Sequence, residues 1–174
     1  MNAAIVVDSL HSKALPDLVR KLLAARQQSL VLYNKLAALK PFVLTEPVQH
    51  LLRQFRQSLV DYLALGPFEV YQALEDQPAD SPYNPARDLA RQFYARIALT
   101  TQTALVFHDR YDGASSDTDL VELREDLSLL GEDLAERIEL EDLILAALRD
   151  AVPPPQPEIR ALESMSIAPQ PVRP

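Results

Sequence analysis

His108, Asp109 and Arg110 follow one another in the sequence, and their side chains are of the types that carry out acid–base chemistry. A histidine beside a carboxylate is a conceivable acid–base pair. The three residues end an amphipathic segment, however, and at such a place they far more often form an ionic cluster on the surface. We therefore favour a surface cluster and predict no catalytic residues.

Metal chemistry is not indicated either. The chain has three histidines, at positions 11, 50 and 108, and no cysteine. Metal sites in helical bundles use Glu-x-x-His pairs that converge from facing helices, and no histidine here has a glutamate at that spacing. The acidic run at 136–142 alternates with apolar residues and matches no oxygen-ligand loop, so a solvated helix face is the favoured interpretation. We predict no metal site and no cofactor.

Glycine-dependent sites are also missing from the sequence. Phosphate-binding loops and nucleophile elbows need the motifs G-x-x-x-x-G-K-[ST], G-x-G-x-x-G or G-x-S-x-G, and none occurs in a chain with 3 glycines. Without cysteine there is no thiol nucleophile and no disulfide. The sequence therefore does not predict an enzyme.

The charge distribution points to a protein partner. The formal net charge is -8, and residues 81–150 carry 15 acidic and 7 basic side chains. Nucleic-acid binding needs clustered Lys and Arg, so direct contact with DNA is not predicted. An acidic face steers a basic protein partner toward itself, although it also serves solubility alone.

The sequence has no segment typical of a membrane protein. The start, MNAAIVVD, lacks the basic region of a signal peptide, and no run approaches the roughly 18 apolar residues of a membrane span. We expect a cytoplasmic protein without membrane contact.

Apolar periodicity predicts four long helices. Residues 16–39 and 45–65 carry apolar positions at steps of 3 and 4, and so do residues 84–108 and 117–149. Gly66 and Pro67 follow the second helix and either kink it or split it, with a short continuation through Leu74. Gly131, inside the last helix, suggests a close helix crossing.

These segments predict an all-α protein, an up-and-down antiparallel helical bundle of four long helices with short accessory helices at the N-terminus and after Gly66. The bundle domain is expected to span residues 1–150. Residues 151–174 are rich in proline and are predicted to form a disordered tail.

Three blocks of the sequence resemble the Rsd/AlgQ family of bacterial regulators. The first is Leu59-Val60-Asp61-Tyr62-Leu63, continued by Gly66 and Phe68. The second is Phe107-His108-Asp109-Arg110-Tyr111-Asp112, and the third is the stretch from Leu134 to Asp142. In the first block the family pattern is Asp-Tyr-Leu-Ser-Ala-Gly-His-Phe, so Ala64 replaces a serine and Pro67 replaces a histidine.

The resemblance implies a function. Members of the family are all-helical cytosolic proteins that bind the C-terminal region of the primary sigma factor, the helix-turn-helix that reads the -35 promoter element, and limit its use by RNA polymerase. It implies an anti-sigma regulator without catalytic activity, a monomer when free that binds sigma 1:1. The alternative is a helical interaction module of the same fold, retargeted to another regulatory protein, to which the replacements at 64 and 67 would point.

The resemblance and the helical spacing together suggest site residues. Candidates for contact with sigma are Asp61, Ala64, Leu65, Phe68 and Tyr71. Residue 61, residue 64 or 65, and residue 68 share one helix face if the helical phase is preserved across Gly66-Pro67. The alternatives are an ion pair with an arginine for Asp61, and core packing for Phe68 and Tyr71. A supporting polar network is predicted for Arg26, Glu136, Arg137, Glu141 and Asp142, and direct contact with sigma is the alternative for the last four.

Overall fold

The computed structural model describes residues 3–39, 45–113 and 122–151. The described part is helical and contains no strand. The elements are α1 Ala3–Ala38, α2 Glu46–Leu65, a π-helical turn η1 Gly66–Val70, α3 Tyr71–Glu75, α4 Asn84–Arg110 and α5 Leu123–Asp150. The predicted all-α bundle of four long helices is confirmed.

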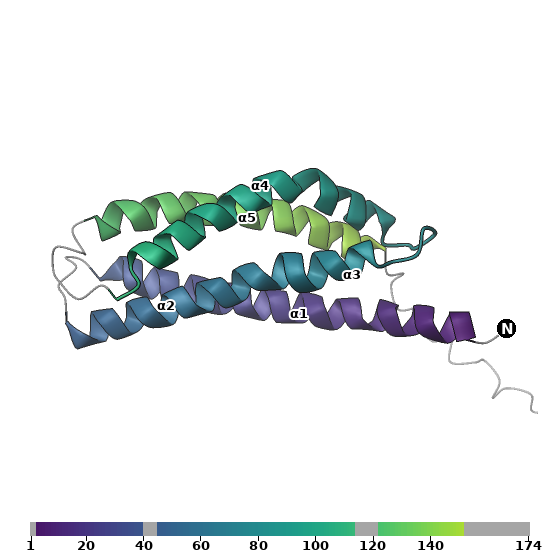
Figure 1. The fold of residues 1–174 in the computed structure, drawn as a ribbon, viewed down its shortest axis with the longest axis horizontal. Coiled ribbons are helices and arrows are strands. Elements are labelled where there is room, and N and C mark those ends of the chain that lie inside the picture. The colour runs from purple at the N-terminus through teal and green to yellow at the C-terminus, as the bar shows by residue number, and fades with distance from the viewer. Residues whose placement is uncertain (1–2, 40–44, 114–121, 152–174) are drawn as a thin grey trace, which may run out of the picture.

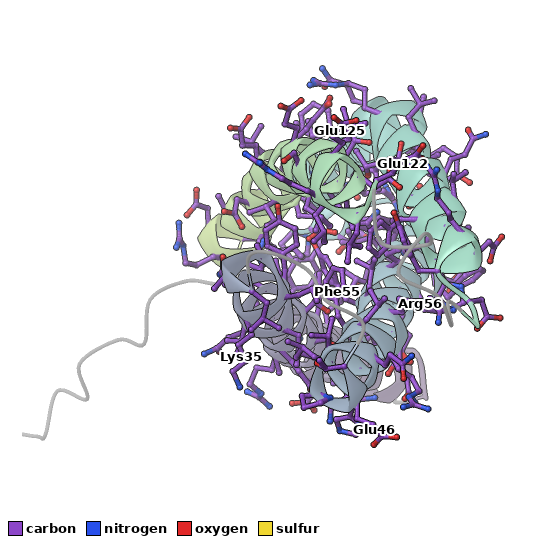
Figure 2. All side chains as sticks on the ribbon, turned by 90° about the vertical axis from the view of Figure 1, so that its left-hand side faces the viewer. Lys35, Glu46, Phe55, Arg56, Glu122 and Glu125 are labelled. Carbon is purple, nitrogen blue, oxygen red and sulfur yellow. The ribbon has the colours of Figure 1, made fainter. Side chains whose placement is uncertain are left out.

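The four long helices form two antiparallel pairs, α1 with α2 and α4 with α5 (Figure 1). Helices α2 and α4 lie beside each other across the pairs but pack far less closely than the partners within a pair. Viewed from one end, the bundle has Phe55 pointing into its centre, while Lys35, Glu46 and Glu125 point outward (Figure 2). Apolar stripes at helical spacing explain this arrangement, because each helix buries one face against its neighbours.

The predicted apolar stripes form the core. On α1, Leu22, Ser29 and Leu36 are buried, and the Ser29 hydroxyl donates a hydrogen bond to the Ser58 carbonyl oxygen at 2.8 Å. The bond explains how a hydroxyl fits in an apolar stripe, since a buried polar group needs a partner. The buried core positions of α2 and α5 include Val48, Leu52, Phe55, Leu59, Leu127, Leu130, Leu134 and Ile144.

Two predicted boundaries are wrong. The expected accessory helix at the N-terminus is part of α1, which runs through Pro16 without a break. A proline inside a helix removes one hydrogen bond, but Leu15 and Leu22 are both buried and hold the helix on either side of it. The last helix, predicted from residue 117, begins at Leu123, and residues 114–121 lie outside the described part of the chain. Of the tail predicted for residues 151–174, residues 152–174 lie outside the described part of the chain too.

The junction after α2 is neither a kink nor a break. The backbone continues through η1 into α3, and the Tyr71 N–H donates to the Gly66 carbonyl oxygen, five residues earlier. A π-helical turn takes one residue more than an α-helical turn. The short helix predicted after Gly66 is therefore joined to α2 by a widened turn.

Gly131 lies at a close crossing of α1 and α5. Tyr33 of α1 donates a hydrogen bond from its hydroxyl to the Leu127 carbonyl oxygen at 2.8 Å. A Cβ atom at position 131 would lie against that hydroxyl and 3.0 Å from the ring carbon Cζ. The absence of a side chain at 131 lets the two helices approach.

We expect Gly131→Ala to lower the free energy of unfolding by about 1–2 kcal/mol, because overpacking outweighs the helical preference of alanine. In a Tyr33→Phe background Gly131→Ala should lower the free energy of unfolding by less, because the hydroxyl that the new methyl group would displace is absent. Urea unfolding of the four proteins in this double-mutant cycle measures the difference. Equal costs in both backgrounds would show that the crossing does not depend on Tyr33.

Candidate functional site

A buried ion pair lies where the helices meet. Arg137 and Glu141 are one turn apart on α5 and are 0% and 1% exposed. Arg137 Nε donates to Glu141 Oε1 at 2.8 Å, and the Tyr62 hydroxyl of α2 donates to Glu141 Oε2 at 2.6 Å. The guanidinium carbon lies 5.3 Å from the centroid of the Tyr62 ring. Each oxygen of the carboxylate thus has its own donor.

The other nitrogens of Arg137 reach two further helices. Nη1 donates to Thr101 Oγ1 of α4 at 2.7 Å, and Nη2 lies 3.4 Å from the Leu63 carbonyl oxygen of α2. A guanidinium presents five N–H groups in a fixed plane, which suits it to joining several acceptors at once. Arg137 therefore ties α5 to both α2 and α4.

Arg26 brings α1 into the same network. Its Nη1 lies 2.7 Å from Asp142 Oδ1 and 3.8 Å from Glu141 Oε2. The structure thus brings together four of the five residues predicted for a polar network. Glu136 lies apart from them, in an exposed ion pair with Arg96 of α4.

Burial controls the electrostatics of this network. Burial raises the pKa of the Glu141 carboxyl, and Arg137, Tyr62 and Arg26 oppose the rise. Burial also raises the pKa of Tyr62, and the Glu141 charge raises it further. The Tyr62 hydroxyl therefore keeps its proton at neutral pH and remains a donor to Glu141.

An open groove runs along the weakly packed side of the bundle, between α2, η1 and α3 on one wall and α4 on the other. Its volume is about 790 Å³. Ala64, Phe68 and Tyr71 contribute to the first wall, and Tyr94 and Leu105 to the second. Phe68 is 78% exposed and Tyr94 is 61% exposed, so two aromatic side chains stand open to solvent at the groove. Large exposed apolar surfaces mark interaction sites.

The predicted sigma-contact residues do not all share this face. Ala64, Phe68 and Tyr71 line the groove, whereas Leu65 packs against the core. Tyr71 is buried at 7% exposure, as its alternative of core packing predicts, while Phe68 is not a core residue.

Asp61 does not line the groove. It is exposed between α1 and α2, where it borders a depression of about 630 Å³ with Gln27 and Gln57. Among the described residues Asp61 forms no ion pair, so the arginine partner considered for it is not found there. The carboxylate is free to meet a partner.

His108, Asp109 and Arg110 lie at the end of α4. The His108 carbonyl oxygen accepts a hydrogen bond from Arg56 Nε at 2.9 Å, and its ring Nδ1 lies 3.2 Å from Asp109. Arg56 also pairs with Asp112 at 2.8 Å. These contacts join α2 to the turn after α4. Within the three described ranges, no group of three or more His, Asp or Glu side chains is placed to hold a metal ion.

Tyr62 and Thr101 belong to the network, but sequence reasoning missed both roles. Tyr62 was named as part of the first family block and not of the network, although a buried tyrosine usually finds a partner for its hydroxyl. The sequence also carries a signal for Arg137 and Glu141, because both fall on the apolar stripe of α5 that continues to Ile144 and Leu148. Thr101 carries no comparable signal.

Fold and site together define the class of the protein, an antiparallel four-helix bundle with a buried ionic network and an apolar groove open to solvent. The chain belongs to the Rsd/AlgQ family, the regulator of the RNA polymerase sigma(70) subunit, whose family model matches residues 11–149. The family expected from the three sequence blocks is therefore confirmed.

Several relatives are each named Regulator of sigma D. The protein of Yersinia enterocolitica is 32% identical over 148 residues, which cover 83% of this chain and 88% of that protein. The protein of Pectobacterium atrosepticum is 33% identical over 136 residues, covering 76% and 88%. The protein of Enterobacter sp. is 34% identical over 140 residues, covering 76% and 81%. No solved structure matches the chain significantly. None of the helices within the described ranges is long and apolar enough to cross a membrane.

We expect Arg137→Met to lower the free energy of unfolding by about 3–5 kcal/mol, because it leaves the Glu141 carboxyl buried without its partner. Arg96→Met is the matched control. It removes an exposed ion pair with Glu136 and should cost about 0–1 kcal/mol. Urea unfolding followed by circular dichroism measures both. A loss for Arg137→Met no larger than that of the control would contradict the role given to the buried pair.

Proposed function

We propose that the protein is an anti-sigma regulator that binds the C-terminal, -35-reading region of the primary sigma factor and limits its use by RNA polymerase. The observation that carries the proposal is the apolar groove with exposed Phe68 and Tyr94, in a chain that belongs to a family of sigma(70) regulators. The protein acts by binding, without catalysis and without contacting nucleic acid itself.

The groove suits a helical partner. Its walls extend from Val60 to Glu75 and from Ala90 to Leu105, 16 residues on each side. At ~1.5 Å per residue each wall is about 24 Å long, or about four helical turns. An amphipathic helix lays its apolar face into a groove of this kind. Aromatic residues, phenylalanine included, are enriched in protein interfaces, and tyrosine is among the residues that most often dominate binding energy.

Charge supports the same partner. A helix-turn-helix that reads DNA presents basic residues to the phosphates, and this chain carries a net charge of -8. Long-range attraction between them speeds encounter, while apolar contacts hold the complex. Asp61, exposed and without an ion pair among the described residues, is placed to meet a basic side chain.

The mechanism is competition for one surface. When the bundle covers the -35-reading region, that region no longer meets the promoter, and sigma is withheld from the polymerase. We place this activity in the cytoplasm, with a free monomer that binds one sigma molecule.

Calorimetric titration of the full chain with full-length primary sigma factor should give saturable 1:1 binding, and sigma truncated before its -35-reading region should not bind. Phe68→Ala should weaken binding at least about tenfold, because it removes the exposed aromatic side chain at the groove. Leu143→Ala, which removes an exposed apolar side chain of α5, is the control and should bind as the native chain does. Absence of binding by the native chain would contradict the proposal and favour a retargeted interaction module.

Reversal of the charge at Asp61 should also weaken binding. Asp61→Lys replaces attraction by repulsion at an exposed position, so the loss should be larger at low salt than at high salt. Glu132→Lys makes the same change in net charge on the exposed face of α5 and serves as the control. Equal losses for the two variants would show that Asp61 acts only through net charge and not by direct contact.

A further inference from the structure

The turn η1 changes the direction in which the residues after it point. Its closing hydrogen bond runs from the Tyr71 N–H to the Gly66 carbonyl oxygen, so the turn holds one residue more than an α-helical turn. One extra residue rotates the residues that follow the turn by about 100° around the helix axis. Phe68 lies within the turn and Tyr71 closes it, so both side chains take their positions from the turn.

Pro67 accounts for the widened turn. In an α-helix the residue at 67 would donate its N–H to the Leu63 carbonyl oxygen, but proline has no N–H to donate. That carbonyl oxygen is instead 3.4 Å from Arg137 Nη2. The buried arginine therefore takes the place of the missing backbone donor.

The packing around Gly66 holds the turn in this form. A Cβ atom at 66 would lie 3.3 Å from Arg137 Nη2 and 3.3 Å from the Tyr71 ring. The guanidinium and the ring thus close over a residue without a side chain. Val70, Tyr71 and Leu74 are all buried after the turn, while Phe68 is 78% exposed at the groove.

We propose that Pro67 and Arg137 are positioning residues for partner binding. Together they set the widened turn that buries Tyr71 and directs Phe68 into the solvent-facing part of the groove. Pro67 is then a specificity-determining residue of this chain, although it need not touch the partner. The proposal rests on the function proposed above, because it assigns partner selection to the geometry of the same groove.

The test is a double-mutant cycle between Pro67→Ala and Phe68→Ala, read as the dissociation constant for full-length primary sigma factor. Pro67→Ala supplies the missing N–H and should weaken binding at least about tenfold. In the native background Phe68→Ala should raise the dissociation constant at least about tenfold. In the Pro67→Ala background it should raise the dissociation constant less than about twofold, because Phe68 is no longer directed into the groove. Additive losses in the cycle would overturn the inference.

Two controls separate positioning from folding. Pro47→Ala removes a proline from the first turn of α2, where an N–H has no helical acceptor, and should leave binding unchanged. The urea midpoint of Pro67→Ala should not fall below that of the native chain, since alanine is the better helix former. Loss of binding together with a lower midpoint would assign the effect to stability and overturn the inference.

A partner-free measurement keeps the inference distinct from the proposed function. Amide hydrogen exchange, followed by NMR, should show a protected amide at residue 67 of Pro67→Ala, bonded to the Leu63 carbonyl, and changed protection at Tyr71. If the native chain does not bind sigma, the proposed function fails and this measurement alone decides the inference. An unprotected amide at 67 with Tyr71 unchanged would overturn it.

Discussion

The bundle is organised around a buried ion pair, Arg137 with Glu141. Isolated in an apolar interior, either Arg137 or Glu141 would be very costly, and both are buried because each finds several partners. Those partners come from every long helix: Arg26 from α1, Tyr62 from α2, Thr101 from α4 and the pair itself from α5. The apolar stripes bring the helices together, but they tolerate small shifts along the axes. The directional hydrogen bonds of the network do not tolerate such shifts. The relative positions of the four helices therefore follow from pairing one guanidinium and one carboxylate with their partners.

The groove and the network meet at shared residues. Leu63 and Thr101 both accept hydrogen bonds from Arg137 inside the bundle and also line the groove, where Ala64 and Phe68 lie beside them. The usual placement of polar and apolar groups is therefore reversed here, with charge inside and aromatic surface outside. An exposed Phe68 gains nothing for the isolated protein, whereas it offers a partner a large apolar contact.

Sequence patterns predicted most of the fold, because helical periodicity depends on local spacing that the chain displays directly. The spacing predicted the four long helices, and Gly131 indicated a helix crossing, which the structure has where Tyr33 packs. It did not settle the junction at Pro67, since a proline leaves a carbonyl oxygen without its donor and only the fold shows which group replaces it. Asp61 and Phe68 were expected on one helix face, but Phe68 lines the groove and Asp61 does not, and Phe68 lies inside the π-helical turn, where α-helical spacing no longer holds. Glu136 was grouped with its sequence neighbours, although its partner, Arg96, is distant in sequence.

The division into two antiparallel pairs bears on how the chain folds. The two helices of each pair follow one another in the sequence, and α2 and α4 pack only loosely across the pairs. Proteins dominated by such local contacts have low contact order and fold in microseconds to milliseconds. The pairs α1 with α2 and α4 with α5 are thus suited to form early and independently, whereas the buried network needs groups from both. Desolvating Arg137 before its acceptors are in place would be unfavourable, so docking of the two preformed hairpins around it is the step expected to set the folding rate.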